Sequence, residues 1–146
     1  MAKALTPQQI LALPLHQQAL AWEDQRNRAR LQEIKQMASA LAMLQPMQSA
    51  IQAAGHTLYA GSLSPAYGKR NTLRISVLTT SSEISLMKAL LTVGFVIIDR
   101  DDTSRTTLRT VVFKKGRLNL QVFTSVEHLT RAEQEYATSR QLKEAA

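Results

Sequence analysis

Residues 56–124 decide the fold, and they read HTLYAGSLSPAYGKRNTLRISVLTTSSEISLMKALLTVGFVIIDRDDTSRTTLRTVVFKKGRLNLQVFT. Residues 72–78 alternate between apolar and polar side chains, which predicts a strand with one buried face. Residues 80–83, Thr-Ser-Ser-Glu, have the spacing of a capping box, so we expect a helix from there to Gly94. The continuous apolar run at residues 95–98 predicts a strand that is covered on both sides.

Further strand signals lie on both sides of this helix. Apolar side chains in residues 117–123 alternate with a second set that we expect on the opposite face, namely Arg117, Asn119, Gln121 and Phe123. We also predict strands at residues 56–60 and 105–113, a loop at 63–71, a turn at 99–104 and a tight hairpin at Lys115-Gly116. A second capping box at residues 124–127 predicts a C-terminal helix.

The N-terminal part has the pattern of helices. Thr6-Pro7 is a good helix start, and Pro14 limits that first helix to a few residues. A longer helix is expected from Leu15 to about Ala54, kinked or split at Pro46. We therefore predict one α+β domain: an N-terminal helical arm (1–55), a mixed β-sheet of about four to five strands with one crossing helix (56–124), and a C-terminal helix (125–146).

Composition narrows the class of protein. The chain has 146 residues and no cysteine, which excludes a disulfide framework and a thiolate metal site. The N-terminus lacks the apolar segment of a signal peptide, and no run reaches the ~20 apolar residues of a membrane span. We therefore expect a cytoplasmic protein that does not insert into a membrane.

The net charge of +7 is concentrated in the central stretch. Residues 56–124 hold ten Lys and Arg against four acidic residues, whereas the two flanking segments are close to neutral. Basic surface of this kind favours nucleic acid or an acidic protein as a partner. A second interpretation needs no partner at all, because a mildly basic protein gains solubility from its charge.

No intact catalytic motif is present. The chain lacks a phosphate-binding loop, a nucleophile elbow and a cysteine nucleophile, and His16, His56 and His128 have no metal-ligand spacing. Asp99, Asp101 and Asp102 are typical of a turn between strands, with a hard-cation site as the alternative. We therefore expect no cofactor and no metal.

The order of elements in residues 56–123 resembles the core of the nucleotidyltransferase fold. Gly61-Ser62 matches the Gly-Ser turn of that family, residues 74–78 occupy the place of its paired carboxylates, and residues 117–122 resemble the strand with the third acid. The resemblance implies a two-metal site for phosphoryl or nucleotidyl transfer. This chain has no acid at these positions, which carry Arg74, Ser76, Asn119 and Gln121, and such side chains cannot hold two divalent ions.

We therefore predict a non-catalytic binding protein with a basic sheet surface. The partner that we favour for this surface is nucleic acid. The predicted phosphate and base contacts are Lys69, Arg70, Arg74, Arg109, Lys114, Lys115 and Arg117. The aromatic side chains near them that are candidates for base stacking are Tyr67, Phe113 and Phe123. A solvated sheet face without a ligand is the plain alternative.

A protein–protein interaction module is the second class of function. The Met- and Ala-rich N-terminal helices would dock to a partner or to a second copy, as in an accessory, inhibitor or assembly protein of a phage or mobile element. The residues predicted for this docking are Trp22, Arg26, Arg28 and Arg30. A solvated helix face explains the three arginines equally well, and an enzyme with an unrecognised site is a third class.

Overall fold

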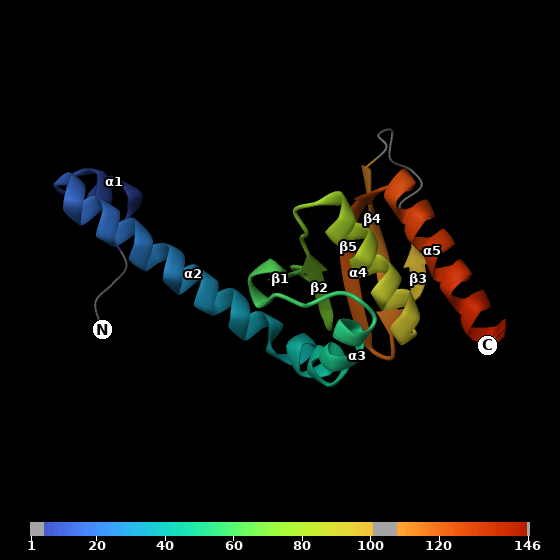
Figure 1. The fold of residues 1–146 in the computed structure, drawn as a ribbon. Helices are drawn as coiled ribbons and strands as arrows, with labels where there is room; N and C mark the ends of the chain where they lie inside the picture. Colours follow the sequence, from blue (N-terminus) through green and yellow to red (C-terminus); the bar gives the residue numbers. More distant parts are fainter. Residues whose placement is uncertain (1–4, 101–107, 146) are drawn as a thin grey trace. The chain divides into compact units, whose positions relative to one another are not determined.

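The computed structural model of the protein describes residues 5–100 and 108–145 (Figure 1). The chain divides into two compact units, Met1–Gln36 and Met37–Ala146. In chain order the elements are α1 (Pro7–Leu11), α2 (Leu15–Leu44), η1 (Gln45–Met47), α3 (Gln48–Ala53), η2 (Ala60–Ser62), β1 (Leu63–Pro65), β2 (Thr72–Ile75), α4 (Thr80–Val93), β3 (Val96–Asp99), β4 (Leu108–Lys115), β5 (Leu118–Ser125) and α5 (Val126–Ala145).

The first unit holds α1 and most of α2. The Thr6 hydroxyl accepts from the Gln9 amide at 3.2 Å and the Gln9 side chain accepts from the Thr6 amide at 2.9 Å, so α1 begins with a capping box. Gln18 of α2 donates to the Leu13 carbonyl at 2.9 Å, which fixes the turn between the two helices. The break before Pro14 and the split of the long helix at Pro46, which lies in η1, are confirmed.

The second unit is built on a mixed sheet with the strand order β1-β2-β5-β4-β3. β2 and β5 run parallel, and every other neighbouring pair is antiparallel. α4 crosses from β2 to β3 at the far edge, and β4 and β5 then return as a hairpin that places β5 beside β2. The predicted α+β class, with a mixed sheet, one crossing helix and a C-terminal helix, is confirmed.

One face of this sheet is covered by helices. Figure 1 shows α4 and α5 on the same side of the sheet. Side chains that alternate onto that side are fully or almost fully buried, among them Leu73, Ile75, Val111, Phe113, Leu118, Leu120 and Val122. They pack with Leu86, Met87 and Leu90 of α4 and with Leu129 and Ala132 of α5. The opposite face, here called the open face, carries the polar half of the same alternation.

The first predicted strand was misplaced. Residues 56–59 form no strand, η2 follows them, and the short strand β1 lies within the segment that the sequence predicted to be a loop. β1 exists because it pairs with β2, with Ser64 opposite Arg74. A three-residue edge strand carries too little local pattern to be recognised, since its stability comes from this pairing.

The apolar run before Asp99 was also misread. β3 is not covered on both faces: Val96 and Ile98 are 58% and 53% exposed, whereas Ile97 packs against the core. β3 is also an edge strand, because it pairs only with β4 among the described residues, and its register shifts between Ile97 and Asp99. A short apolar run does not report how many faces of a strand are covered.

The hairpin that follows differs slightly from the prediction. β4 is described from Leu108 and continues to Lys115, two residues beyond the predicted end, and the turn consists of Gly116 and Arg117. Gly116 has a φ of 61°, which glycine adopts without steric cost. The predicted strand start at residues 105–107 and the turn residues Asp101 and Asp102 lie outside the described residues.

Both predicted N-caps are shifted by one residue. α4 is capped by Thr79, whose hydroxyl accepts from the Ser82 amide at 3.1 Å. At the start of α5 the Ser125 hydroxyl accepts from the His128 amide at 3.1 Å. Glu83, predicted to close the first box, instead accepts hydrogen bonds from Thr124 and from His128 Nδ1. It thereby ties the start of α4 to the end of β5 and the start of α5.

Replacing Thr79 by alanine is expected to lower the free energy of unfolding by about 1 kcal/mol, because the Ser82 amide loses its acceptor. The matched control is Thr80→Ala, at the exposed position that the sequence predicted as the cap, and it should cost less than about 0.5 kcal/mol. Urea unfolding followed by circular dichroism measures both values. Equal losses in the two variants would contradict the assignment of the cap to Thr79.

Candidate nucleic-acid interface

Four exposed cations from two separate segments gather at one end of the sheet. Lys69 and Arg70 immediately precede β2, and Arg117 immediately precedes β5. Because β2 and β5 run parallel, with the Asn119 amide bonded to the Asn71 carbonyl at 2.9 Å, these two strand starts lie side by side. Lys114 joins them, since it pairs with Asn119 across the hairpin. We call Lys69, Arg70, Lys114 and Arg117 the basic end.

The loop that carries Lys69 and Arg70 is held in a defined conformation. Gly68 and Asn71 both have positive φ angles, 76° and 54°, which Gly and Asn tolerate best. The Thr72 hydroxyl donates to the Arg70 carbonyl at 2.9 Å, and the Ser39 hydroxyl donates to Asn71 Oδ1 at 3.2 Å. The two cations are therefore presented by an ordered turn.

The described acids of the sheet and of the first helical turns lie at the opposite end. Asp99 ends β3, Glu83 lies in the first turn of α4 after β2, and Glu127 lies in the first turn of α5 after β5. Strands β2, β3 and β5 all run the same way, so their ends meet at the edge remote from the basic end. None of these three acids therefore lies beside the basic end.

The open face continues from the basic end along β5 and β2. Arg74 is exposed and pairs with Gln121 on the parallel neighbour. Phe123, two residues further along β5, is 58% exposed and pairs with Thr110 of β4. Asn119 lies on the same face, although its Oδ1 atom is buried. This face presents a guanidinium, amides and an aromatic ring in adjacent positions.

Two of the predicted basic contacts lie elsewhere. Arg109 pairs with the buried Thr124 and is half-buried on the helix-covered side, so it does not lie on one sheet surface with Arg74, as the predicted set of contacts requires. Lys115 is also half-buried, and its Nζ donates to the Val93 carbonyl at 2.6 Å, where it caps the last turn of α4. A one-residue step along a strand separates Lys115 from Lys114, and it reverses the face.

The three aromatic candidates for base stacking differ in their exposure to solvent. Phe113 is fully buried in the core, so it cannot stack on a base. Tyr67 is 71% exposed in the loop that carries Lys69, and Phe123 is exposed on the open face. The alternation of Phe123 with Gln121 in the sequence already indicated that Phe123 lies on the polar side of its strand.

The residues predicted for docking all lie on α2 in the first unit. Arg26 pairs with Glu23 at 3.5 Å, Arg28 pairs with Asp24 at 3.0 Å, and Arg30 pairs with Glu33 at 2.9 Å. Trp22 is 39% exposed on the same helix. Each arginine has a local acid, so this segment is balanced in charge and gives no reason to expect an acidic partner.

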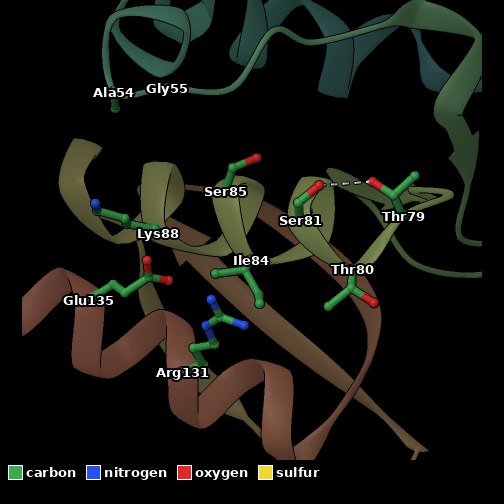
Figure 2. Close-up of a pocket in the computed structure, with 10 residues that line it drawn as sticks. All are labelled: Ala54, Gly55, Thr79, Thr80, Ser81, Ile84, Ser85, Lys88, Arg131 and Glu135. Atoms are coloured by element: carbon green, nitrogen blue, oxygen red, sulfur yellow. Dashed lines mark hydrogen bonds between the residues drawn. The ribbon is translucent and has the colours of Figure 1, made fainter.

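A cavity of about 620 Å³ lies between α4, α5 and the end of α3 (Figure 2). Its charged lining residues are Lys88 of α4 and Arg131 and Glu135 of α5, which Figure 2 shows on facing helices. Thr79, Ser81 and Ser85 add hydroxyl groups. The charges are of mixed sign, so this cavity is electrostatically less suited to a polyanion than the basic end.

A second cavity, of about 470 Å³, lies beyond the end of β2. Of the positions that the resemblance assigns to metal ligands only Ser76 lines it, whereas Arg74, Asn119 and Gln121 lie on the open face. The described residues that line it include Ser62, Ser76 and His56 but no Asp or Glu. His56 Nδ1 lies 3.2 Å from the Ser85 hydroxyl, and burial lowers the pKa of His56 below 6.5. The Ser85 hydroxyl also donates to the Ser82 carbonyl of its own helix at 3.0 Å.

Within residues 5–100 and 108–145, no three His, Asp or Glu side chains gather closely enough to hold a metal ion. Over the same residues, no helix combines the length and the apolar character that crossing a lipid bilayer requires. Comparisons with protein-family models, with curated proteins and with solved structures find no match to this chain.

Proposed function

We propose that this protein is a non-catalytic nucleic-acid-binding protein, whose contact surface is the basic end together with the open face. The observation that carries this proposal is the convergence of Lys69, Arg70, Lys114 and Arg117 at the starts of two parallel strands. Lysine and arginine side chains bind phosphates independently of sequence, and each contact releases a counterion. An acid-poor cluster of four exposed cations suits a phosphate backbone.

The open face supports the same proposal with groups that contact bases. Arg74 and Gln121 are neighbours there, and both side chains form hydrogen bonds with base edges or phosphates. The resemblance to the nucleotidyltransferase core is compatible with this role, because Arg74 and Asn119 stand where that family carries metal-binding acids. A surface with a cation and an amide at these positions attracts a polyanion and lacks the anionic ligands that catalytic divalent ions need.

The test is a fluorescence anisotropy titration of the full chain with labelled single-stranded and duplex probes. If the basic end supplies four phosphate contacts, a plot of the logarithm of the binding constant against the logarithm of the salt concentration should have a slope of about −3 or steeper. Binding at about 50 mM salt that weakens by roughly 50-fold or more at about 200 mM is expected. No binding of any probe at the lower salt concentration would refute the proposal.

A second candidate function is self-association through α2. Leu20, Leu31 and Ile34 are 59%, 51% and 41% exposed, and steps of eleven and three residues place them on one side of the helix. An apolar stripe between charge-balanced segments is typical of a helix that packs against another helix. A second copy of this chain offers the same stripe.

The triple variant Leu20→Gln, Leu31→Gln, Ile34→Gln tests this candidate. We expect light scattering to give the mass of a dimer for the wild-type chain and the mass of a monomer for the variant. The reason is that the free energy of association falls by about 25 cal/mol for each Å² of apolar surface that is no longer buried. The control is Arg26→Gln with Arg28→Gln, which changes exposed residues of the same helix outside the stripe. A wild-type chain that is monomeric over a wide concentration range contradicts self-association.

A further inference from the structure

The position of Phe123 is unusual for an aromatic residue of a central strand. β5 has neighbours on both sides, yet the Phe123 side chain is 58% exposed, because it points to the face that α4 and α5 do not cover. Its cross-strand partner is Thr110, which is small, and the next side chain along the strand on this face is Gln121. The ring is therefore accessible above a rigid sheet.

We propose that the open face binds single-stranded nucleic acid, with one base stacked on Phe123, and this inference rests on the proposed function. Stacking on a side chain requires a base with a free face, and both faces of a base inside a duplex are already occupied by its neighbours. A phenylalanine ring on an open sheet stacks on any base, so it favours single strands without selecting a sequence.

The groups around Phe123 complete a path for such a strand. Gln121 lies two residues from Phe123 on the same face, at roughly 7 Å along β5, and its amide can bond the edge of a neighbouring base. Arg74, beside Gln121, is placed to meet a phosphate. Arg117 of the basic end lies six residues from Phe123, a distance of roughly 20 Å along the strand. An oligonucleotide of several residues is needed to reach both ends.

Single-stranded DNA and single-stranded RNA offer the same chemistry to this path, namely free base faces and a phosphate backbone. The probes are therefore an oligo(dT), an oligo(U) and a duplex of equal length, each of about 12 nucleotides. Equal binding of the first two means that stacking and phosphate contacts suffice. A preference for oligo(U) means that a 2′-hydroxyl contact adds to them.

The decisive variants change the ring and keep the surface. Phe123→Leu retains an apolar side chain without a π-face, and it is expected to weaken single-strand binding by roughly 5- to 150-fold, the effect of losing one stacked base. Phe123→Trp should bind at least as tightly as wild type. The control is Leu142→Ala, at an apolar residue of α5 that is 69% exposed and lies outside the open face, which should leave the affinity unchanged.

Stacking also has a direct spectroscopic signature. Trp22 is the only tryptophan, so the variant Trp22→Phe with Phe123→Trp carries a single indole on the open face. A base stacked on that indole should quench its fluorescence on titration with oligo(dT) or oligo(U), and the duplex should quench it far less. Circular dichroism of each variant confirms that it is folded.

The outcomes separate the two proposals. If wild type binds duplex as tightly as single strands and Phe123→Leu binds like wild type, stacking is wrong while the proposed function stands. If no probe binds at low salt, the proposed function fails and this inference fails with it. Loss of affinity in Phe123→Leu together with retention in Phe123→Trp and Leu142→Ala supports the stacked base.

Discussion

Replacement of the four cations of the basic end by glutamine is expected to weaken binding of single-stranded oligonucleotides by roughly several hundredfold at about 0.1 M salt. The variant is Lys69→Gln, Arg70→Gln, Lys114→Gln, Arg117→Gln. Each phosphate contact contributes about 0.7 to the salt slope for a single strand, so the slope should decrease in magnitude by about 3. Anisotropy titrations at several salt concentrations measure both quantities.

The matched control removes the same number of positive charges elsewhere on the surface. It is Arg26→Gln, Arg28→Gln, Arg140→Gln, Lys143→Gln, at four exposed helical positions. We expect its affinity to stay within about threefold of wild type, because exposed charges that do not contact the nucleic acid are largely screened at this salt concentration. A loss in the control as large as that in the basic-end variant would mean that net charge, and not the convergence of these residues, drives binding.

Replacing Phe113 by alanine is expected to lower the free energy of unfolding by about 3–5 kcal/mol. Phe113 has no exposed surface, lies opposite Leu120 in the centre of the sheet and belongs to the same cluster as Met87 and Leu90 of α4. A domain of this size has a total stability of about 5–15 kcal/mol, so the loss is a large fraction of it. Urea unfolding followed by circular dichroism gives the value.

Phe123→Ala is the matched control, because it removes the same side chain from the other face of the same sheet. Since Phe123 is more than half exposed, its loss should cost less than about 1 kcal/mol. The two phenylalanines therefore have opposite roles: Phe113 contributes to stability and Phe123 to the proposed binding. Equal destabilisation by the two substitutions would mean that the open face is covered in the folded protein.

The sequence predicted those helices and strands that have a clear pattern within their own residues. Strict alternation identified the two faces of β5, including the exposed position of Phe123, and it identified β2, which ends at Ile75, three residues before the predicted end. Pro14 and Pro46 marked helix breaks, because proline removes a backbone donor wherever it occurs. Helix starts were right to within one residue, since Thr79 and Thr80 are chemically identical caps and only the backbone conformation decides between them.

Features that depend on pairing were not accessible in this way. β1 and the edge position of β3 follow from which strands are neighbours, a property that no single segment carries. The shift of Arg109 and Lys115 to the covered face has a similar origin. Both residues look like surface cations in the sequence, and their direction follows from the register of β4 against β5.

The sequence by itself determined the composition of this surface: an excess of Lys and Arg in residues 56–124, and strands with polar and apolar sides. Only the tertiary structure decided which of those cations act together. Lys69 and Arg117 are 48 positions apart by their numbers, and they lie at one end of the sheet because β5 inserts parallel to β2. Long-range strand pairing gathers the basic end, and local physical chemistry cannot specify it.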